Sequence, residues 1–185
     1  MIPQITNHTI SIVVPALNEE LHVEGAVKEI ISAVNGRFRD YQIVLVNDGS
    51  TDGTGAVMDR LAEKHEQIVV VHNPTNLGLG GAYKRGVAAA TMEYVMMVPG
   101  DNAHPAEGII PILAGVGQAD IVIPYPINAE ARSRFRRLIS WGFVQVVNLA
   151  LGLRVRYYNG LVVHRTDYLR QIEINTNGFA YQARS

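Results

Sequence analysis

Cysteine is absent from the 185-residue sequence, so disulfide bonds and zinc sites built from thiolates are excluded. A chain of this length can bury a core large enough to fold without such cross-links. An excess of charge of either sign is also lacking, because 16 Lys and Arg residues stand against 17 Asp and Glu residues. The bulk composition therefore gives no indication of a nucleic-acid partner, and a reducing, cytoplasmic setting is expected.

The sequence pattern also gives no indication of a targeting or membrane-spanning segment. The N-terminus, MIPQITNHTI, has neither the basic region nor the apolar block of a secretion signal. The longest uncharged stretch, residues 138–153, is shorter than the roughly 20 residues that a spanning helix needs. We therefore predict no transmembrane helix.

Short runs of mostly β-branched residues recur along the chain, and segments with helical periodicity separate them. The runs cover residues 10–14, 42–46, 68–71, 94–98 and 120–124. Helices are expected over residues 23–34, around residues 57–61 and over residues 82–90. Continuous apolar runs are typical of strands that are buried on both faces. The pattern predicts an α/β fold with a mainly parallel central sheet covered by helices.

Polar, glycine-containing segments follow four of the predicted strands. They read PALNEE at residues 15–20, NDGS at 47–50, NPTNLGLGG at 73–81 and PGDN at 99–102. In an open parallel sheet, ligands bind outside the carboxyl ends of the strands. The four segments therefore predict one binding site at one edge of the sheet.

Two acidic residues in these segments have a chemical interpretation. Asp48 could accept a hydrogen bond from the ring N–H of a nucleotide base, with Gly49 allowing the backbone to turn. Since DGSTD is rich in capping residues, an N-cap of the following helix is the alternative. Asp101, followed by Asn102 and His104, could hold a divalent cation against a diphosphate, and an ordinary turn is the alternative there.

The motifs PALNEE, VNDGSTDGT, NLGLGGAYKRG and PGDNAHPAE, in this order, resemble those of the family-2 glycosyltransferases. Within that family the chain is similar to the dolichyl-phosphate mannosyltransferase and polyprenyl-phosphate glycosyltransferase branch, over residues 11 to about 183. The resemblance implies a Rossmann-like GT-A fold, a UDP- or GDP-linked sugar donor, inverting transfer of the sugar, and a Mg²⁺ or Mn²⁺ ion.

The resemblance also implies roles for individual residues in donor binding and catalysis. Pro15, Leu17 and Glu20 would line the nucleotide pocket, Asp48 would read the base, Gly78 and Ala82 would let a helix approach the donor, Lys84 or Arg85 would lie near phosphate, and Asp101 would be the metal ligand and a catalytic residue.

Three positions depart from the family pattern. Pro99 replaces the first acid of an Asp-x-Asp motif, Ala103 stands where relatives often have Gln, and Arg184 stands where the family stretch GFAYQAE has Glu. A hard divalent cation binds less well when fewer oxygen ligands are available. These departures weaken the expectation of a metal and leave a catalytically impaired nucleotide-sugar-binding or scaffold protein as the alternative function.

Arginines gather in the second part of the chain. Between residues 126 and 159 there are six arginines and one acid, Glu130. A phosphate monoester acceptor is ionised near neutral pH and needs cations, whereas a sugar hydroxyl needs a general base. The balance favours a polyprenyl or dolichyl phosphate acceptor at a membrane surface, held by the candidate catalytic residues Arg132, Arg134 and Arg137.

The apolar stretch beside these arginines allows more than one interpretation. It suits a helix lying at a bilayer surface, but also a core helix with solvated ends or a helix in a homo-oligomer interface. We predict a single domain in which residues 1–125 bind the nucleotide sugar and residues 126–185 face the acceptor and the membrane. The expected location is cytoplasmic, and peripheral at the inner face of the membrane if this stretch binds lipid.

Overall fold

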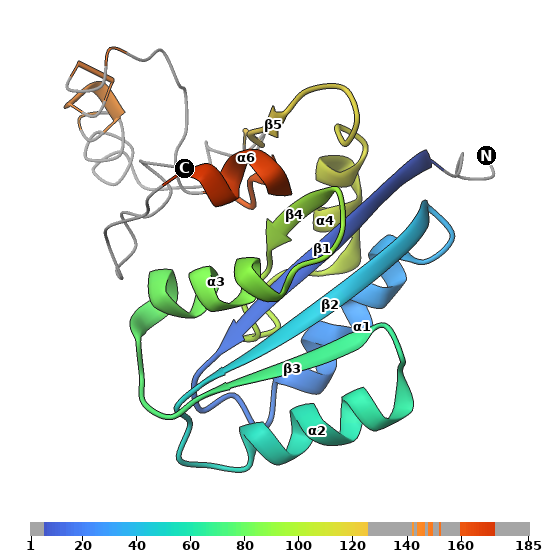
Figure 1. The fold of residues 1–185 in the computed structure, drawn as a ribbon, viewed down its shortest axis with the longest axis vertical. Helices are drawn as coiled ribbons and strands as arrows, with labels where there is room; N and C mark the ends of the chain where they lie inside the picture. The colour runs from blue at the N-terminus through green and yellow to red at the C-terminus, as the bar shows by residue number, and fades with distance from the viewer. Residues whose placement is uncertain are drawn as a thin grey trace.

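The computed structural model describes residues 6–125, 142, 144–146, 148–149, 152 and 160–172 (Figure 1). In chain order the elements are β1 (Thr6–Ala16), α1 (Val23–Val34), β2 (Phe38–Asp48), α2 (Thr54–Lys64), β3 (Ile68–Asn73), α3 (Gly78–Ala89), β4 (Tyr94–Met97), α4 (Ala106–Leu113), β5 (Ile121–Val122), β6 (Val163–Arg165) and α6 (Thr166–Gln171).

A six-stranded sheet forms the centre of the fold, with the strand order β3-β2-β1-β4-β6-β5. Strand β1 pairs in parallel with β2 and β4, and β2 pairs in parallel with β3. Strand β6 runs antiparallel to both of its neighbours, β4 and β5. The mainly parallel α/β sheet that the sequence pattern predicted is therefore confirmed.

The side of the sheet formed by β6 and β5 differs from the prediction. The expected strand at residues 120–124 is reduced to the two residues of β5. Strand β6, which the pattern did not predict, lies between β4 and β5. With three residues, β6 is too short to show an alternating or continuous apolar pattern of its own.

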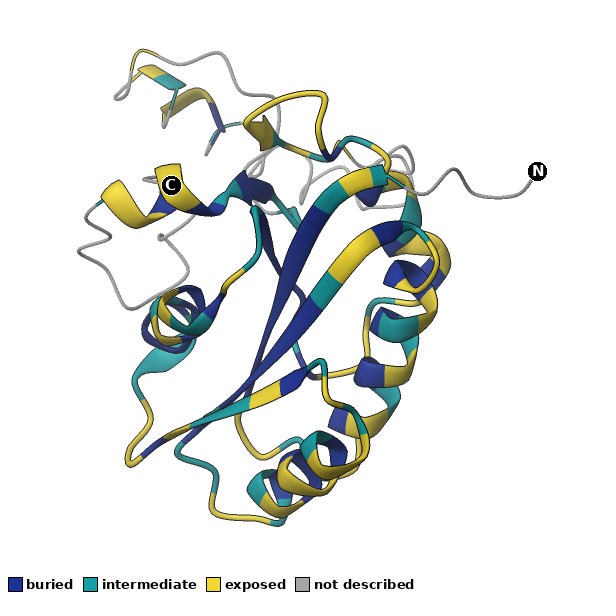
Figure 2. Cartoon of the chain, turned by 45° about the vertical axis from the view of Figure 1, so that its right-hand side comes forward, coloured by how far each residue is buried: buried dark blue, intermediate teal, exposed yellow. Residues whose placement is uncertain are grey.

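Helices cover both faces of the sheet (Figure 1). On one face, α1, α2 and α4 pack against a large apolar cluster that includes Ile10, Ile12 and Val14 of β1. On the other face, α3 and α6 pack against a smaller cluster that includes Val13. Because alternate residues of a strand point to opposite faces, the continuous apolar run of β1 serves both clusters. Figure 2 shows β1 as buried along most of its length.

The helices of the first three crossovers agree with their sequence patterns. The apolar stripe of α1 is buried, and Gly36 follows the helix with a φ of 69°. Helix α3 begins at Gly78, four residues before the predicted start at Ala82. Gly86 lets α3 lie directly on the sheet, because a Cβ at this position would overlap the side chain of Val13.

Helix α4 was not predicted. It follows the loop that contains Asp101 and packs against the sheet through buried Ile109 and Leu113. Among the helices of the described residues, none has the length and apolar character needed to cross a bilayer.

Candidate functional site

The loops after β1, β2, β3 and β4 meet at one edge of the sheet (Figure 1). Ala16 is paired with Asn47, and Asp48 is paired with Asn73, at the carboxyl ends of their strands. The backbone N–H of Gly100, in the fourth loop, donates to the carbonyl oxygen of Pro15 at 3.0 Å. The four polar segments of the sequence therefore lie side by side, as a shared ligand site requires.

Side-chain hydrogen bonds tie the first two loops to each other. The backbone N–H of Asn18 donates to Ser50 Oγ at 3.0 Å, and Asn18 Oδ1 accepts from the N–H of Thr51 at 2.9 Å. Glu20 Oε2 accepts from the N–H of Gly53 at 3.0 Å. Glu20, a predicted pocket residue, thus has a structural contact that fixes the loop after β2.

Asp48 is buried at the end of β2, with 4% of its surface exposed. Its Oδ1 accepts from Asn73 Nδ2 at 2.8 Å and from the backbone N–H of Leu77 at 2.9 Å. Leu77 is the N-cap residue of α3. The carboxylate of Asp48 therefore connects the end of β2 to the end of β3 and to the start of α3.

The alternative prediction, that Asp48 is the N-cap of α2, is wrong. The N-cap residue of α2 is Gly53, and the nearest capping contact comes from Asp52, whose Oδ1 accepts from the N–H of Thr54 at 3.0 Å. A hydrogen bond from the Thr54 hydroxyl holds the pKa of the Asp52 carboxyl below its usual value. Capping in DGSTD is thus done by its last residue.

Two glycines at this edge have a φ that other residues rarely adopt. Gly49 has a φ of 72°, and a Cβ there would lie 2.5 Å from the backbone carbonyl carbon of Thr75. Gly78 has a φ of 76°, and its N–H donates to Asn76 Oδ1 at 2.7 Å. Glycine at position 49 lets the loops after β2 and β3 approach closely, and glycine at position 78 allows the positive φ at the start of α3.

The fourth loop carries the predicted metal ligand, Asp101. This residue is exposed, and its Oδ1 accepts from the backbone N–H of Ala103 at 3.0 Å. Asn102 has a φ of 56° and its side chain lies against Gly25 of α1. In the part of the chain that the structure describes, no three His, Cys, Asp or Glu side chains form a metal-binding group. Asp101 offers a cation a single carboxylate.

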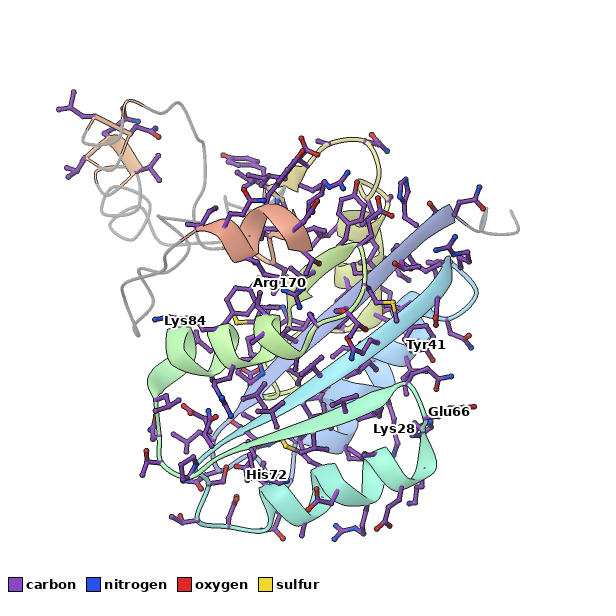
Figure 3. All side chains as sticks on the ribbon, viewed as in Figure 1. Lys28, Tyr41, Glu66, His72, Lys84 and Arg170 are labelled. Carbon is purple, nitrogen blue, oxygen red and sulfur yellow. The ribbon has the colours of Figure 1, made fainter. Side chains whose placement is uncertain are left out.

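The other predicted site residues have different surroundings. Pro15 is buried at the end of β1, and Leu17, in the loop that follows, is 39% exposed. Figure 3 shows Lys84 on α3, and Ala82 is buried on the same helix against the sheet. Arg132, Arg134 and Arg137 lie outside the described residues.

One residue of this edge was not among the predicted site residues. Asn73 is 4% exposed and links Asp48 to Arg85, whose Nε donates to Asn73 Oδ1 at 3.3 Å. The sequence shows that Asn73 is a polar residue at the end of an apolar run, but it does not show which residue of the neighbouring strand lies opposite.

Comparison with known proteins agrees with this arrangement. The model of the glycosyl transferase family 2 matches residues 11–176, most of the chain. This chain belongs to glycosyl transferase family 2. The family-2 resemblance of the four motifs is therefore confirmed.

The similar family-2 proteins include enzymes named for lipid-phosphate acceptors. The undecaprenyl-phosphate mannosyltransferase of Micrococcus luteus is 30% identical over 162 residues, which cover 80% of this chain and 67% of that protein. A dolichyl-phosphate beta-glucosyltransferase of Trichomonas vaginalis is 28% identical, over 75% of this chain and 46% of that protein. The dolichol-phosphate mannosyltransferase of Pyrococcus furiosus is 27% identical, over 92% of this chain and 50% of that protein. This chain therefore spans about half the length of several relatives it matches.

Solved structures confirm the GT-A-like fold. The glucosyl-3-phosphoglycerate synthase of Mycobacterium tuberculosis in complex with UDP is similar with a TM-score of 0.66 and 25% identity, over 95% of this chain and 63% of that chain. A structure of the same enzyme with Mn²⁺, UDP and phosphoglyceric acid has a TM-score of 0.70 and 21% identity, over 95% of this chain and 62% of that chain. TarS of S. aureus has a TM-score of 0.64 and 17% identity, over 95% of this chain and 53% of that chain.

Proposed function

We propose that this chain transfers a sugar from a UDP- or GDP-linked donor to a polyprenyl or dolichyl phosphate. The observation that carries the proposal is the buried carboxylate of Asp48 at the meeting point of the loops, in a chain of glycosyl transferase family 2. The names of the relatives support the lipid-phosphate acceptor. The fold alone does not decide between substrates, so the argument depends on the residues of the site.

Recognition of the donor base is assigned to Asp48. Both of the hydrogen bonds that it accepts reach Oδ1, so Oδ2 is the oxygen that can accept the ring N–H of uracil or guanine. Pro15, Leu17 and Glu20, on the neighbouring loop, would form the walls around the nucleotide. The close approach of the loops at Gly49 supports a compact pocket of this kind.

The diphosphate of the donor is assigned to the loop of Asp101 and to the start of α3. Gly78 would let the donor come close to this helix, and Lys84 would supply positive charge. Magnesium in phosphate-transferring sites is commonly held by one or two carboxylates together with substrate phosphates. The single carboxylate of Asp101 fits such a site, with Mg²⁺ or Mn²⁺ binding together with the donor. The ion would neutralise charge on the departing nucleoside diphosphate.

The transfer itself is a displacement at the anomeric carbon of the donor sugar. An oxygen of the lipid phosphate forms the new bond to this carbon, the bond to the diphosphate breaks, and the configuration is inverted. The bonding electron pair leaves with the nucleoside diphosphate. The attacking phosphate is already ionised, so no general base is required. Arg132, Arg134 and Arg137 are the proposed cations that hold it.

The proposal also assigns different roles to the two parts of the chain. Residues 1–125 would bind the donor and residues 126–185 would face the acceptor, within one domain. The protein would then act at the cytoplasmic face of a membrane, where the lipid phosphate is found. The apolar stretch beside the arginines would lie on the bilayer or in a homo-oligomer interface.

Nucleoside diphosphate release tests the proposal directly. The purified protein is incubated with UDP- and GDP-sugars, with Mg²⁺ or Mn²⁺, and with either a short polyprenyl phosphate or the matching polyprenol. Release that depends on the phosphate-bearing lipid is the expected result. Saturable donor binding without release would refute the transferase and support the nucleotide-sugar-binding alternative, for which Pro99 and Ala103 are the motivation.

A further inference from the structure

Asn73 and Asp48 form a buried polar pair at the last rung of the β2–β3 ladder. The two residues are register partners, and each has 4% of its surface exposed. Asn73 Nδ2 donates to Asp48 Oδ1 at 2.8 Å. A buried carboxylate is costly unless it is hydrogen-bonded, so this contact is part of what allows an acid to occupy the site.

The orientation of the Asn73 amide is fixed from both ends. Arg85 Nε donates to Asn73 Oδ1 at 3.3 Å, and a guanidinium has only donors. The Asp48 carboxylate, at the other end, presents an acceptor oxygen, Oδ1. The amide therefore fits in one orientation, with its oxygen toward Arg85 and its nitrogen toward Asp48.

A second donor fixes the same carboxylate oxygen from the backbone. The N–H of Leu77 reaches Asp48 Oδ1 at 2.9 Å, so two donors from different segments converge on this atom. Rotation of the carboxylate would break both bonds. The position of Oδ2 is consequently determined by Asn73 and Leu77, although neither needs to touch a ligand.

We infer that Asn73, held by Arg85, is a positioning residue that keeps Asp48 an oriented acceptor and so determines which nucleotide bases the site takes. The inference rests on the proposed function, in which Asp48 reads the donor base. An acceptor at Oδ2 pairs with the ring N–H of uracil or guanine. Cytosine and adenine present an unprotonated ring nitrogen at the corresponding position and are rejected, because two acceptors then face each other.

The variant Asn73→Asp keeps the shape of the side chain but replaces the amide donor that faces Asp48 by a carboxyl oxygen. Two carboxyl groups at this separation cannot both ionise, so they retain a proton. Arg85 favours the ionised form of the new carboxyl beside it, which leaves the proton on Asp48. That proton lies on Oδ1, which faces residue 73, so Oδ2 becomes the carbonyl oxygen of a neutral acid and accepts a hydrogen bond less strongly than a carboxylate does. The preference for a base with a ring N–H is therefore expected to weaken.

The experiment measures dissociation constants by calorimetry for UDP, GDP, CDP and ADP, and nucleoside diphosphate release in parallel. The wild-type protein is expected to favour UDP over CDP, or GDP over ADP, by roughly tenfold or more, the scale of one specific base contact. Asn73→Asp is expected to reduce that ratio roughly tenfold. The matched control Asn35→Asp, at an exposed position after α1 at the opposite edge of the sheet, is expected to keep it.

The ratio of dissociation constants between bases distinguishes a positioning role from a general loss of stability. A merely structural defect weakens the binding of all four nucleotides alike and leaves this ratio unchanged. An unchanged ratio in folded Asn73→Asp would overturn the inference and leave the proposed function standing. A wild-type protein without base preference would overturn it as well. Conversely, a ratio that responds to Asn73 in a protein that transfers no sugar would refute the proposed function alone.

Arg85→Met decides the question if Asn73→Asp does not fold. Arg85 is exposed on α3, so its replacement is expected to leave the fold intact. Loss of its hydrogen bond frees the Asn73 amide, and the base preference is expected to fall roughly threefold, the equivalent of one modest hydrogen bond. A base preference equal to that of the wild-type protein in this variant would contradict the inference.

Discussion

Glu29 of α1 accepts a hydrogen bond through Oε2 from the backbone N–H of Ala106, at 2.7 Å. Ala106 is the first residue of α4, and its N-cap residue, Pro105, offers no side-chain cap. The free N–H groups at a helix start need acceptors, and a carboxylate there also interacts favourably with the helix dipole. A residue of another helix therefore caps α4 and fixes the end of the Asp101 loop.

Removal of this cap is expected to destabilise the protein. Glu29→Ala leaves the Ala106 N–H without its acceptor, and the free energy of unfolding should fall by about 1 kcal/mol. Urea denaturation measures the change. The control Glu63→Ala removes an exposed carboxylate from α2 and should alter stability by less than about 0.5 kcal/mol. Equal effects of the two variants would show that the Glu29 contact contributes nothing specific.

The close packing of α3 on the sheet gives a second prediction. A Cβ at Gly86 would overlap the side chain of Val13, whereas a Cβ at Gly108 of α4 would meet nothing within 4 Å. Gly86→Ala should destabilise the protein by about 1–3 kcal/mol through overpacking. Gly108→Ala should stabilise it by about 0.5–1 kcal/mol, because alanine is the better helix former. Melting temperatures that shift in the same direction would contradict this account.

The sequence was sufficient to predict the strands that are long and buried. Strands β1, β2 and β4 contain buried apolar runs because helices cover both of their faces, and such runs are visible without a structure. Strand β3, at the edge of the sheet, also has an apolar run, although Val69 in it is 41% exposed. Strands β5 and β6 have two and three residues, too few for a period. Helix α4 contains Gly108 and Pro111, which oppose a helix by propensity, and it is held by Glu29 and by the packing of Ile109.

The sequence was sufficient to predict which loops form the site, but not which side chains contact each other within it. Carboxyl ends of parallel strands share an edge, so the four polar segments could be placed together from the sequence. The pairing of Asp48 with Asn73 depends on the strand register, and Asp48 capping α3 rather than α2 depends on how the loop after β3 returns to the sheet. The roles of Arg132, Arg134 and Arg137 stay predictions.

Arg170 gives a third prediction, because it links α6 to the end of α3 (Figure 3). Its Nη2 donates to the carbonyl oxygens of Val87, at 3.2 Å, and Ala88, at 3.3 Å, where the helix has lost its own donors. Arg170→Met should lower the free energy of unfolding by about 1 kcal/mol. The control Lys28→Met breaks only an exposed ion pair with Glu24 and should cost less than about 0.5 kcal/mol in urea denaturation.

His164 makes the stability of the protein depend on pH. Burial in β6 lowers the pKa of His164 to about 4, against about 6.5 for an exposed histidine. Between these values the unfolded chain binds a proton that the folded chain excludes. The free energy of unfolding should therefore fall as the pH drops through this window, by about 2 kcal/mol between about pH 7 and pH 5.

The variant His164→Gln isolates this contribution. Urea denaturation at both pH values gives the drop in stability for each protein, and the drop should be smaller in the variant by most of the His164 contribution. Other groups titrate equally in the two proteins, so they cancel in the difference. If wild type and variant lose the same free energy of unfolding, the folded protein does not exclude the proton from His164.

Asp101 is the residue whose replacement most directly tests the chemistry of the proposed site. Asp101→Asn keeps the acceptor for the Ala103 N–H through the amide oxygen, so the loop geometry is retained. The ionised carboxylate is lost, and with it the proposed oxygen ligand of the divalent ion. We expect kcat for sugar transfer to fall roughly 100-fold or more. Binding of UDP or GDP without divalent ions should change little, because Asp48 and not Asp101 is proposed to read the base.

Asp40→Asn is the matched control for this variant, since Asp40 is exposed at the opposite end of β2. Steady-state kinetics at several Mg²⁺ concentrations should show a lost or right-shifted metal dependence for Asp101→Asn and a normal one for Asp40→Asn. No group of three His, Cys, Asp or Glu side chains among the described residues could take over the ion, so excess Mg²⁺ should restore at most part of the activity. Full activity of Asp101→Asn would mean that the departing diphosphate is neutralised by cationic side chains.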